Sequence, residues 1–363
     1  MPHRSATGRQ TAVLDGLVQV RIMGDEPFID WERPQGEPPP PPEPGLHEPV
    51  LLKEVLEFLA LRPDGTYLDV TVGTGGHAQA VLARLGAGGL LVGMDRDAEV
   101  LQVARRRLQE VGSEARFALR TGDFADVACV CQDLGVDAVD GVVADLGMSS
   151  RQLDSAERGF SHTMRGPLDM RFDRSQTTTA AHVIARSSLS ELTSILFRYG
   201  EEPRARRIAQ AVLRRRRQHP LETTSELAEV VRSVVPSRAQ VDALARTFQA
   251  LRISVNAEME SLEQFLRVVP SLLRRGGRLV VIGFHSLEDR QVKQALRRGE
   301  RAGIMRTLTV KPQRPSPEEV SENPRSRSAR LRAGEKVVLT GLASPEPEQA
   351  KRAKRPETTG GER

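Results

Sequence analysis

Residues 69–77, with the sequence DVTVGTGGH, decide the fold of this chain. The stretch follows the apolar pair Tyr67-Leu68 and precedes an apolar helical run from Gly75. Glycines between a strand and a helix leave backbone N–H groups open to a ligand, and the start of the helix favours negative charge. The stretch therefore predicts a strand, a ligand-binding loop and a helix, the first unit of an α/β domain.

Strand and helix patterns alternate around this loop. We expect helices at 47–59, 75–85 and 97–109, and strands at 66–70, 89–95, 116–124 and 136–147. Alternation of strands and helices predicts an open, doubly wound, mostly parallel sheet. The predicted fold class is therefore α/β.

A run of helical patterns interrupts this alternation. Helices are expected at 190–200, 203–217 and 223–235, the last with a capping box from Thr223 to Glu226. We therefore expect an all-helical insert at 152–245. A long amphipathic helix near 241–273 and a strand at 276–284 then return the chain to the sheet, so the core is split into 46–151 and 246–343.

Polar segments end the 363-residue chain on both sides. Residues 1–45 finish in GEPPPPPEPG, which favours an extended spacer, and we expect both 1–45 and 344–363 to be disordered. No apolar run reaches the roughly 18 residues of a membrane span, and the start lacks an apolar leader, so a cytoplasmic protein without a membrane partner is expected. Cys129 and Cys131 have no Cys/His cluster nearby, so no disulfide framework or metal site is expected.

Positive charge is concentrated in arginine runs, although the formal net charge is only +5. The runs are RARR at 204–207, RRRR at 214–217 and RRGGR at 274–278. Such clusters suit a polyanion, and a solvated arginine face is the alternative. The stripe expected to follow RNA phosphates consists of Arg204, Arg207, Arg214 and Arg215.

The glycine loop fits more than one cofactor. GTGGHA at 73–78 satisfies the dinucleotide pattern, and Asp95 follows at the distance where an acid accepts hydrogen bonds from ribose hydroxyls. Asp69 favours S-adenosylmethionine over NAD, because its carboxylate would repel a pyrophosphate but suits a cationic ligand. GDF at 122–124 also places an acid and a flat ring where an adenine could bind. Each of these residues also has a purely structural alternative: Asp69 could cap the turn, Asp123 could cap a helix, and Phe124 could be a core residue.

Collinear blocks resemble the bacterial ribosomal RNA small subunit methyltransferase H family. They run from about Leu46 to Gly334 and include DVTVGTGGHAQAVL, DLGMSSRQLDSAERGFS, RTFQALRISVNAEMESLEQFL and GGRLVVIGFHSLEDRQVK. The resemblance implies a Rossmann-like, S-adenosylmethionine-dependent methyltransferase core with an inserted helical domain that recognises RNA. It also implies methyl transfer to N4 of a cytidine in the decoding region of 16S rRNA, within the small ribosomal subunit. Whether the protein forms a homodimer stays open.

The resemblance also implies a set of cofactor contacts. They fall on Gly75, Gly76, His77, Asp95, Phe124, Asp145 and Gln152. The residue patterns add Asp69 and Gly73 to this set. Without the resemblance, Gln152 would be expected at the surface.

Asp145 and His285 are the candidate catalytic residues. Cytosine N4 is conjugated into the ring and is a poor nucleophile, so an oxygen acceptor on its N–H would hold it in line with the methyl group. Asp145 ends the fourth strand and is the first candidate, with a purely cofactor-binding role as the alternative. His285, in GFHSLEDR, follows a later strand at the same edge of the sheet. It could position the base or contact a phosphate; the alternative is a buried structural histidine.

Three positions depart from the family pattern. Arg151 replaces a usual proline, Arg165 stands in a block that usually carries an acid, and VDALARTFQ, which contains Asp242, replaces a usual His-Pro. These departures concern substrate contacts and not the reaction. Two other classes also stay open: a dinucleotide oxidoreductase, which would not explain Asp69 or the arginine stripe, and a non-catalytic ribosome-assembly factor with a vestigial pocket.

Overall fold

The computed structural model describes residues 31–32 and 49–337. Its described residues belong, apart from Trp31, to one compact unit that begins at Glu32. The tails expected at 1–45 and 344–363 lie outside the described residues, with the exception of positions 31 and 32. Glu32 pairs with Phe117 through two backbone hydrogen bonds of 2.9 Å, so this part of the first tail is ordered, which composition did not indicate.

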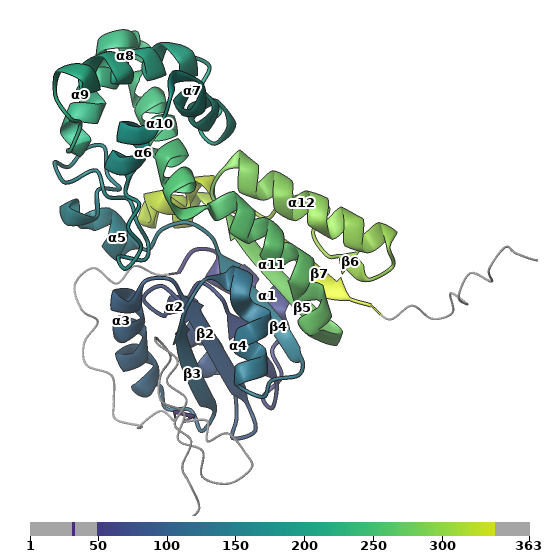
Figure 1. Cartoon of the computed structure of the whole chain (residues 1–363). Helices are drawn as coiled ribbons and strands as arrows, with labels where there is room; N and C mark the ends of the chain where they lie inside the picture. Colours follow the sequence, from purple (N-terminus) through teal and green to yellow (C-terminus); the bar gives the residue numbers. More distant parts are fainter. Residues whose placement is uncertain (1–30, 33–48, 338–363) are drawn as a thin grey trace, which may run out of the picture. The chain divides into compact units, whose positions relative to one another are not determined.

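Seven strands form one sheet among the described residues (Figure 1). Their bounds are β1 Thr66–Asp69, β2 Leu90–Asp95, β3 Arg116–Thr121, β4 Val139–Asp145, β5 Leu273–Gly283, β6 Met305–Thr307 and β7 Arg330–Lys336. The order is β3-β2-β1-β4-β5-β7-β6; the first five pair in parallel, and β7 runs antiparallel to both of its neighbours. The predicted doubly wound, mostly parallel sheet is confirmed.

The central strands are mostly apolar, because helices cover both faces of the sheet. β2 and β4 are buried at every position except the last, which is typical of a strand inside a parallel sheet. The last residues of β1, β2 and β4 are all aspartates, namely Asp69, Asp95 and Asp145. Since these strands are neighbours and run in parallel, three carboxylates meet at one edge of the sheet.

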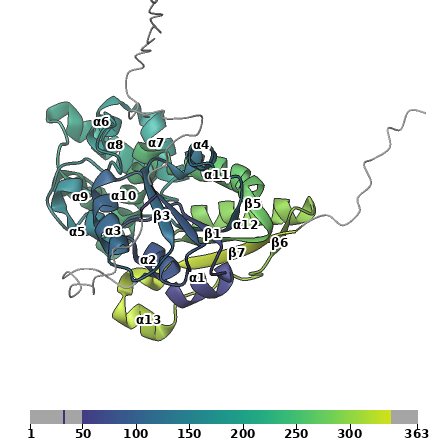
Figure 2. The ribbon, with the colours of Figure 1, turned by 90° about the horizontal axis from the view of Figure 1, so that it is seen from below.

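Two groups of helices pack on the sheet. One group is α1 Leu52–Leu59, α2 Gly76–Leu82 and α3 Ala98–Gln109; the other is α4 Val127–Asp133, α11 Glu258–Leu272 and α12 Ser286–Arg301. Figure 2 shows α4 and α11 on one side of β1 and β3, with α1 and α2 on the other. A short helix, α13 Pro317–Glu322, precedes β7. In the described ranges, no helix combines the length and apolar character of a membrane span.

The helices from α5 to α10, which follow β4, build a second hydrophobic core. They are α5 Ser150–Asp154, α6 Ala180–Arg186, α7 Leu189–Arg198, α8 Ala205–Gln218, α9 Thr224–Val234 and α10 Gln240–Asn256. Their apolar cluster runs from Phe160 to Val255 and is distinct from the cluster around the sheet. The capping box between Thr223 and Glu226 is confirmed. The insert boundary expected at residue 245 falls inside α10, whose apolar contacts continue past it.

The single helix expected near 241–273 is wrong. The chain forms α10 and α11 instead, separated by Ala257 in the left-handed region with φ 49°. Asn256 stabilises this break: its Nδ2 donates to the carbonyls of Met170 and Arg252, and its Oδ1 accepts the N–H of Phe172. Hydrophobic periodicity continues across the break, so it does not reveal one left-handed residue fixed by distant contacts.

Arg158 joins the insert to the sheet core. Its Nη1 donates to Oδ2 of Asp97 at 2.6 Å, and its Nη2 donates to the carbonyls of Arg171 and Phe172. Asp97 in turn caps α3 by accepting the N–H of Glu99. Both members of the ion pair are buried, so removal of either leaves a charge without compensation in the interior.

We predict that Arg158→Ala lowers the free energy of unfolding by about 3 kcal/mol or more, because it leaves the buried Asp97 carboxylate without its main partner. Urea denaturation followed by circular dichroism measures this change. Arg174→Ala is the matched control: Arg174 forms an exposed pair with Glu99, and its loss should change stability by less than about 1 kcal/mol. Equal effects of the two variants would contradict the prediction.

Candidate functional site

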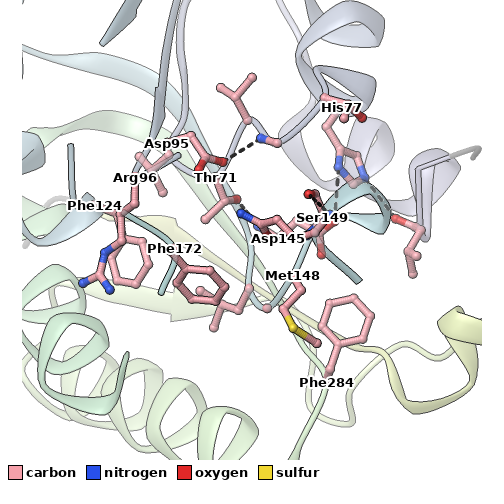
Figure 3. A pocket seen from close by; sticks show the side chains of 18 of the residues that line it. Thr71, His77, Asp95, Arg96, Phe124, Asp145, Met148, Ser149, Phe172 and Phe284 are labelled. Atoms are coloured by element: carbon pink, nitrogen blue, oxygen red, sulfur yellow. Dashed lines mark hydrogen bonds and ion pairs between the residues drawn. The ribbon is translucent and has the colours of Figure 1, made fainter. Parts of the chain in front are cut away.

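A pocket, here called the edge pocket, opens where β1, β2 and β4 end (Figure 3). Its walls come from the loop after β1, the ends of β2 and β4, the segment 146–152 and α11. Of the residues predicted to bind a cofactor, those on its wall are Gly73, Gly76, His77, Asp95, Phe124, Asp145 and Gln152. The structure thus gathers most of the predicted set, while Asp69 and Gly75 lie behind the wall.

Gly73 and Gly75 give the loop its shape, each in a different way. Both have positive φ, 52° and 87°, which favours glycine. The N–H of Gly73 donates to Oδ2 of Asp95 at 2.8 Å and so joins the loop to β2. A Cβ on Gly75 would lie 3.2 Å from Cα and Cβ of Ala104. Gly75 therefore allows α2 and α3 to pack closely and does not face the pocket.

Asp95 presents a fixed carboxylate to the pocket. Its Oδ2 accepts from Gly73, and its Oδ1 accepts the N–H of Asp97 at 2.9 Å. Burial raises the pKa of Asp95 to about 6, against the lowering effect of these hydrogen bonds. Each carboxylate oxygen has a further lone pair, so Asp95 can still accept hydrogen bonds from hydroxyl groups of a ligand.

Asp69 lies behind the wall of the edge pocket and does not line it. It is 1% exposed; its Oδ1 accepts the N–H of Thr71 at 3.1 Å, and its Oδ2 has no hydrogen-bond partner. Burial, with a smaller effect of the nearby Asp95 charge, raises the pKa of Asp69 to about 7. The proposed role of Asp69 in holding a cation is therefore electrostatic, without direct contact.

Asp145 and His77 face one another across the pocket floor (Figure 3). Nε2 of His77 lies 3.0 Å from the carbonyl oxygen of Val50, and its Nδ1 lies 3.7 Å from Oδ2 of Asp145. A carbonyl only accepts, so Nε2 carries the proton and Nδ1 has a lone pair. Burial lowers the pKa of His77 to about 4, so the ring is neutral at neutral pH.

The carboxylate of Asp145 has an unfilled hydrogen-bonding capacity. Its backbone N–H donates to Oγ1 of Thr71 at 2.6 Å, which fixes its position, yet its buried Oδ1 has no partner. Burial raises the pKa of Asp145 well above its usual value, and the Asp69 and Glu288 carboxylates raise it further. A cation or N–H donor in the pocket would satisfy Oδ1 and reduce this repulsion.

The opposite wall of the edge pocket is apolar. Phe124, Phe172 and Leu262 line it, and the Phe124 ring packs edge-on against Phe265 with centroids 5.6 Å apart. Asp123 does not line the pocket: it caps a short helix and pairs with Arg96, as the structural alternative proposed. The flat Phe124 ring and the apolar side chains around it form a slot for a planar ligand group.

Gln152 is buried, with 4% exposure, and the surface position that its sequence context suggested is wrong. Its Oε1 accepts the N–H of Ser149 at 3.0 Å, and its Nε2 donates to Oδ2 of Asp97 at 2.8 Å. Together with Ser149 it forms a capping box at the start of α5. The S-x-x-Q spacing is a readable signal for this cap.

His285 lies next to the edge pocket and not on its wall. It caps α12: its Nδ1 accepts the N–H of Glu288 at 3.4 Å, and its Nε2 lies 3.2 Å from Oε1 of Glu288. Glu258 completes a group of three side chains that could hold a metal ion. However, Arg252 already donates to both oxygens of Glu258 at 2.8 and 2.9 Å, so an arginine compensates this carboxylate.

Several residues on the wall of the edge pocket carry no recognisable signal in the sequence. Met148, Phe172 and Phe284 point into it from three separate loops (Figure 3). Their apolar side chains resemble ordinary core residues in the sequence, so only the tertiary fold identifies them. The departures Arg151, Arg165 and Asp242 are all exposed and lie outside this wall.

The arginine stripe on α8 borders a surface hollow. Arg204, Arg207 and Arg214 line it together with Arg206, which is not part of the predicted stripe. Arg215 is turned elsewhere: it pairs with Glu226 at 3.8 Å and donates to the carbonyl of His219. Three of the four predicted arginines therefore share one face of the helix.

Comparison with known proteins covers nearly all of the described chain. Residues 45–337 match the model of a family described as the MraW methylase family. Curated relatives named ribosomal RNA small subunit methyltransferase H include those of Acidobacterium capsulatum, 46% identical over 80% of this chain and 98% of the relative, and Trichlorobacter lovleyi, 44% identical over 80% and 98%. The relative of the same name from a Cyanothece species is 47% identical over 80% of this chain and 95% of its own length.

We predict that Asp69→Asn flattens the pH dependence of stability in the ligand-free protein. The pKa of Asp69 is about 7, above its usual 3.8, so the folded state keeps a proton that the unfolded chain releases. The stabilisation that this retained proton gives to the folded state is complete below the usual pKa of 3.8. It is lost as the pH rises through about 7. Between about pH 5 and about pH 8 the parent should lose stability relative to Asp69→Asn, as measured by denaturant unfolding. A constant difference between the two proteins would contradict this.

Proposed function

Because the chain belongs to the MraW methylase family, we propose that it binds S-adenosylmethionine in the edge pocket and methylates N4 of a cytidine in the decoding region of 16S rRNA. The curated relatives carry a name that states methylation of small-subunit ribosomal RNA. The observation that carries the proposal is the position of Asp145, whose partnerless oxygen lies at the edge of the sheet beside a slot for a planar group. The proposal places the protein in the cytoplasm with its substrate.

The residues present fit this cofactor. S-adenosylmethionine carries a sulfonium and an ammonium against one carboxylate, and Asp95 and Asp145 line the pocket with Asp69 behind them. The apolar slot at Phe124 suits the adenine, Asp95 suits the ribose hydroxyls, and the acceptors of Asp145 and His77 suit the ammonium. Gln152 helps to hold this wall through its bond to Asp97.

The pocket argues against the dinucleotide oxidoreductase. A pyrophosphate would bring two negative charges towards buried carboxylates whose pKa values are already raised. Repulsion in a poorly solvated site is strong. Family membership in methylases points in the same direction.

Asp145 is the proposed acceptor in the reaction. When bound, S-adenosylmethionine supplies an electrophilic methyl group on a sulfonium. The Thr71 hydroxyl fixes the Asp145 backbone, so that Oδ1 can accept one N4–H of cytosine and orient the nitrogen lone pair. As positive charge develops on N4, the carboxylate stabilises it and can take the proton at Oδ1. His77, which is neutral and turns its lone pair towards Oδ2 of Asp145, adds no positive charge of its own beside this carboxylate.

The hollow on α8 supports the RNA part of the proposal. Arg204, Arg207 and Arg214 lie together on one surface, and arginines spaced along a helix can contact successive phosphates. An assembly factor without activity would also use such a surface. The Asp145 carboxylate, held in place and with Oδ1 unpartnered, has no evident purpose in a protein that only binds RNA.

The test is methylation of small subunits from cells that lack the gene. Incubation with S-adenosylmethionine should produce N4-methylcytidine in 16S rRNA, as detected by nucleoside mass spectrometry. Asp145→Asn keeps the shape and removes the charge; it should lower the single-turnover rate constant by about 10² or more, roughly 2.7 kcal/mol, with a smaller change in cofactor affinity.

Two outcomes would count against this proposal. Absence of N4-methylcytidine after incubation with the parent protein would refute the activity. A normal rate constant for Asp145→Asn at saturating cofactor and subunits, with weaker cofactor binding, would make Asp145 a binding residue only. His285 would then be the next residue to test for positioning the base.

We predict that replacing Arg204, Arg207 and Arg214 together by Gln weakens subunit binding and reduces its salt dependence. Each lost phosphate contact should lower the slope of log affinity against log salt by roughly one. The control removes three exposed arginines elsewhere, Arg106, Arg267 and Arg301, with the same change in net charge. Filter binding at several salt concentrations measures both slopes, and equal slopes for the two triple variants would exclude a specific role of the stripe.

A further inference from the structure

We propose that a second cavity, here called the insert hollow, receives the target cytosine after the base leaves its stack in the RNA. This inference rests on the proposed function. The insert hollow lies between the helical insert and the loop before α12, and residues of both line it, among them Phe160, His162, Phe248, Phe284 and His285. Enzymes that modify a base bind it in such a pocket outside the helix.

The insert hollow adjoins the edge pocket. Met148, Phe284 and Arg325 line both cavities. In Figure 3, Met148 lies beside Asp145, and the Phe284 ring lies next to Met148. A base held in the insert hollow would therefore present one edge to Asp145 past Met148. That edge must carry N4 if the methyl group is to reach it.

Aromatic rings are concentrated around this cavity. Phe, Trp and Tyr make up only 4% of the chain, yet Phe160, Phe248 and Phe284 all line the insert hollow. His162 adds a fourth ring, edge-on to Phe248 with centroids 5.8 Å apart. Aromatic faces hold unstacked bases by stacking. The gathering of these rings suits a planar base better than it suits a phosphate or a sugar.

Two buried ring nitrogens in the insert hollow make no well-aligned hydrogen bond to the protein. They are Nδ1 of His162 and Nε2 of His285, the latter 3.2 Å from Oε1 of Glu288. Because Nδ1 of His285 accepts the N–H of Glu288, the proton of a neutral His285 ring lies on Nε2, which makes that atom a donor. Cytosine offers acceptors at N3 and O2, whereas uracil has an N–H at position 3. An Nε2–H that turns from the Glu288 carboxylate to the base would therefore favour cytosine over uracil.

Arg252 adds a further N–H donor to the same wall. It lines the insert hollow and binds both oxygens of Glu258 through Nε and Nη2, which leaves Nη1 outside that pair. A second donor beside His285 would match the second acceptor of the cytosine edge. The insert thus supplies stacking and part of the base recognition, in addition to any contacts with phosphates.

Phe248→Leu tests the stacking role. Leucine keeps apolar volume in the core of the insert and removes the ring face, and Phe248 does not line the edge pocket. We expect the single-turnover rate constant at saturating small subunits to fall about tenfold or more, because a stacking partner of the base is lost. Affinity for S-adenosylmethionine and for subunits should stay within about twofold, since phosphate contacts dominate subunit binding. Phe197→Leu, at a ring that is 64% exposed on α7, is the control and should match the parent.

His285→Asn tests the donor, because asparagine keeps the cap of α12 and removes the imidazole. It should lower the same rate constant, with cofactor affinity unchanged. A merely structural role would change stability or cofactor affinity together with the rate, so thermal unfolding is measured for both variants. If Phe248→Leu and His285→Asn both methylate subunits at the parent rate, the insert hollow does not hold the base.

Photocrosslinking locates the base directly. Small subunits reconstituted with 5-iodocytidine at the target position, bound to the parent enzyme and irradiated, should crosslink to Phe160, Phe248 or Phe284. The inference would be overturned if the base crosslinked only to residues outside the insert hollow. It would also be overturned if no crosslink formed with an enzyme that methylates unmodified subunits. If the parent enzyme methylates no subunits at all, the proposed function itself fails, so the two failures are distinguishable.

Discussion

Repulsion among carboxylates that are buried or half-buried is the constraint on which the site depends. Asp69, Asp95 and Asp145 end three neighbouring parallel strands, so the sheet itself brings like charges together where little water reaches them. Backbone N–H groups of the glycine loop compensate Asp95 and Asp69 in part. The pKa values of all three carboxyl groups are nevertheless raised, first by burial and to a smaller extent by neighbouring carboxylates. A positively charged ligand relieves it, which couples ligand binding to the stability of the fold.

The connection between the insert and the sheet shapes both cavities. Asn256 and Arg158 hold the backbone around Phe172, which lines the edge pocket, through hydrogen bonds from two different segments. The left-handed Ala257 then turns the chain from α10, which carries Phe248, into α11, which lines the edge pocket. A few polar contacts thus fix the position of the insert relative to the carboxylates, and a shift at this junction would change both cavities together.

The local sequence pattern was sufficient to predict the sheet and many of the residues that line the edge pocket. Strands β1 to β5 and the residues Asp95, Phe124 and Asp145 followed from alternation and from position at strand ends. Other features depend on distant contacts. The break at Ala257 is fixed by Met170 and Phe172, and Gln152 is buried because Asp97 lies beside it. Phe284 and Met148 look like core residues in the sequence, and the direction of Arg215 depends on Glu226, so no local period reveals their roles.

Glu32 has a consequence for the exposed border of the sheet. β3 is an outer strand, and Glu32 pairs with the N–H and C=O of Phe117 while its side chain binds Arg105. Unpaired groups on an outer strand can recruit a strand of another molecule and start aggregation. The opposite border is formed by the three-residue β6, which offers little length for such pairing. A residue far before the glycine loop thus occupies part of the hydrogen-bonding edge that another molecule's strand would need.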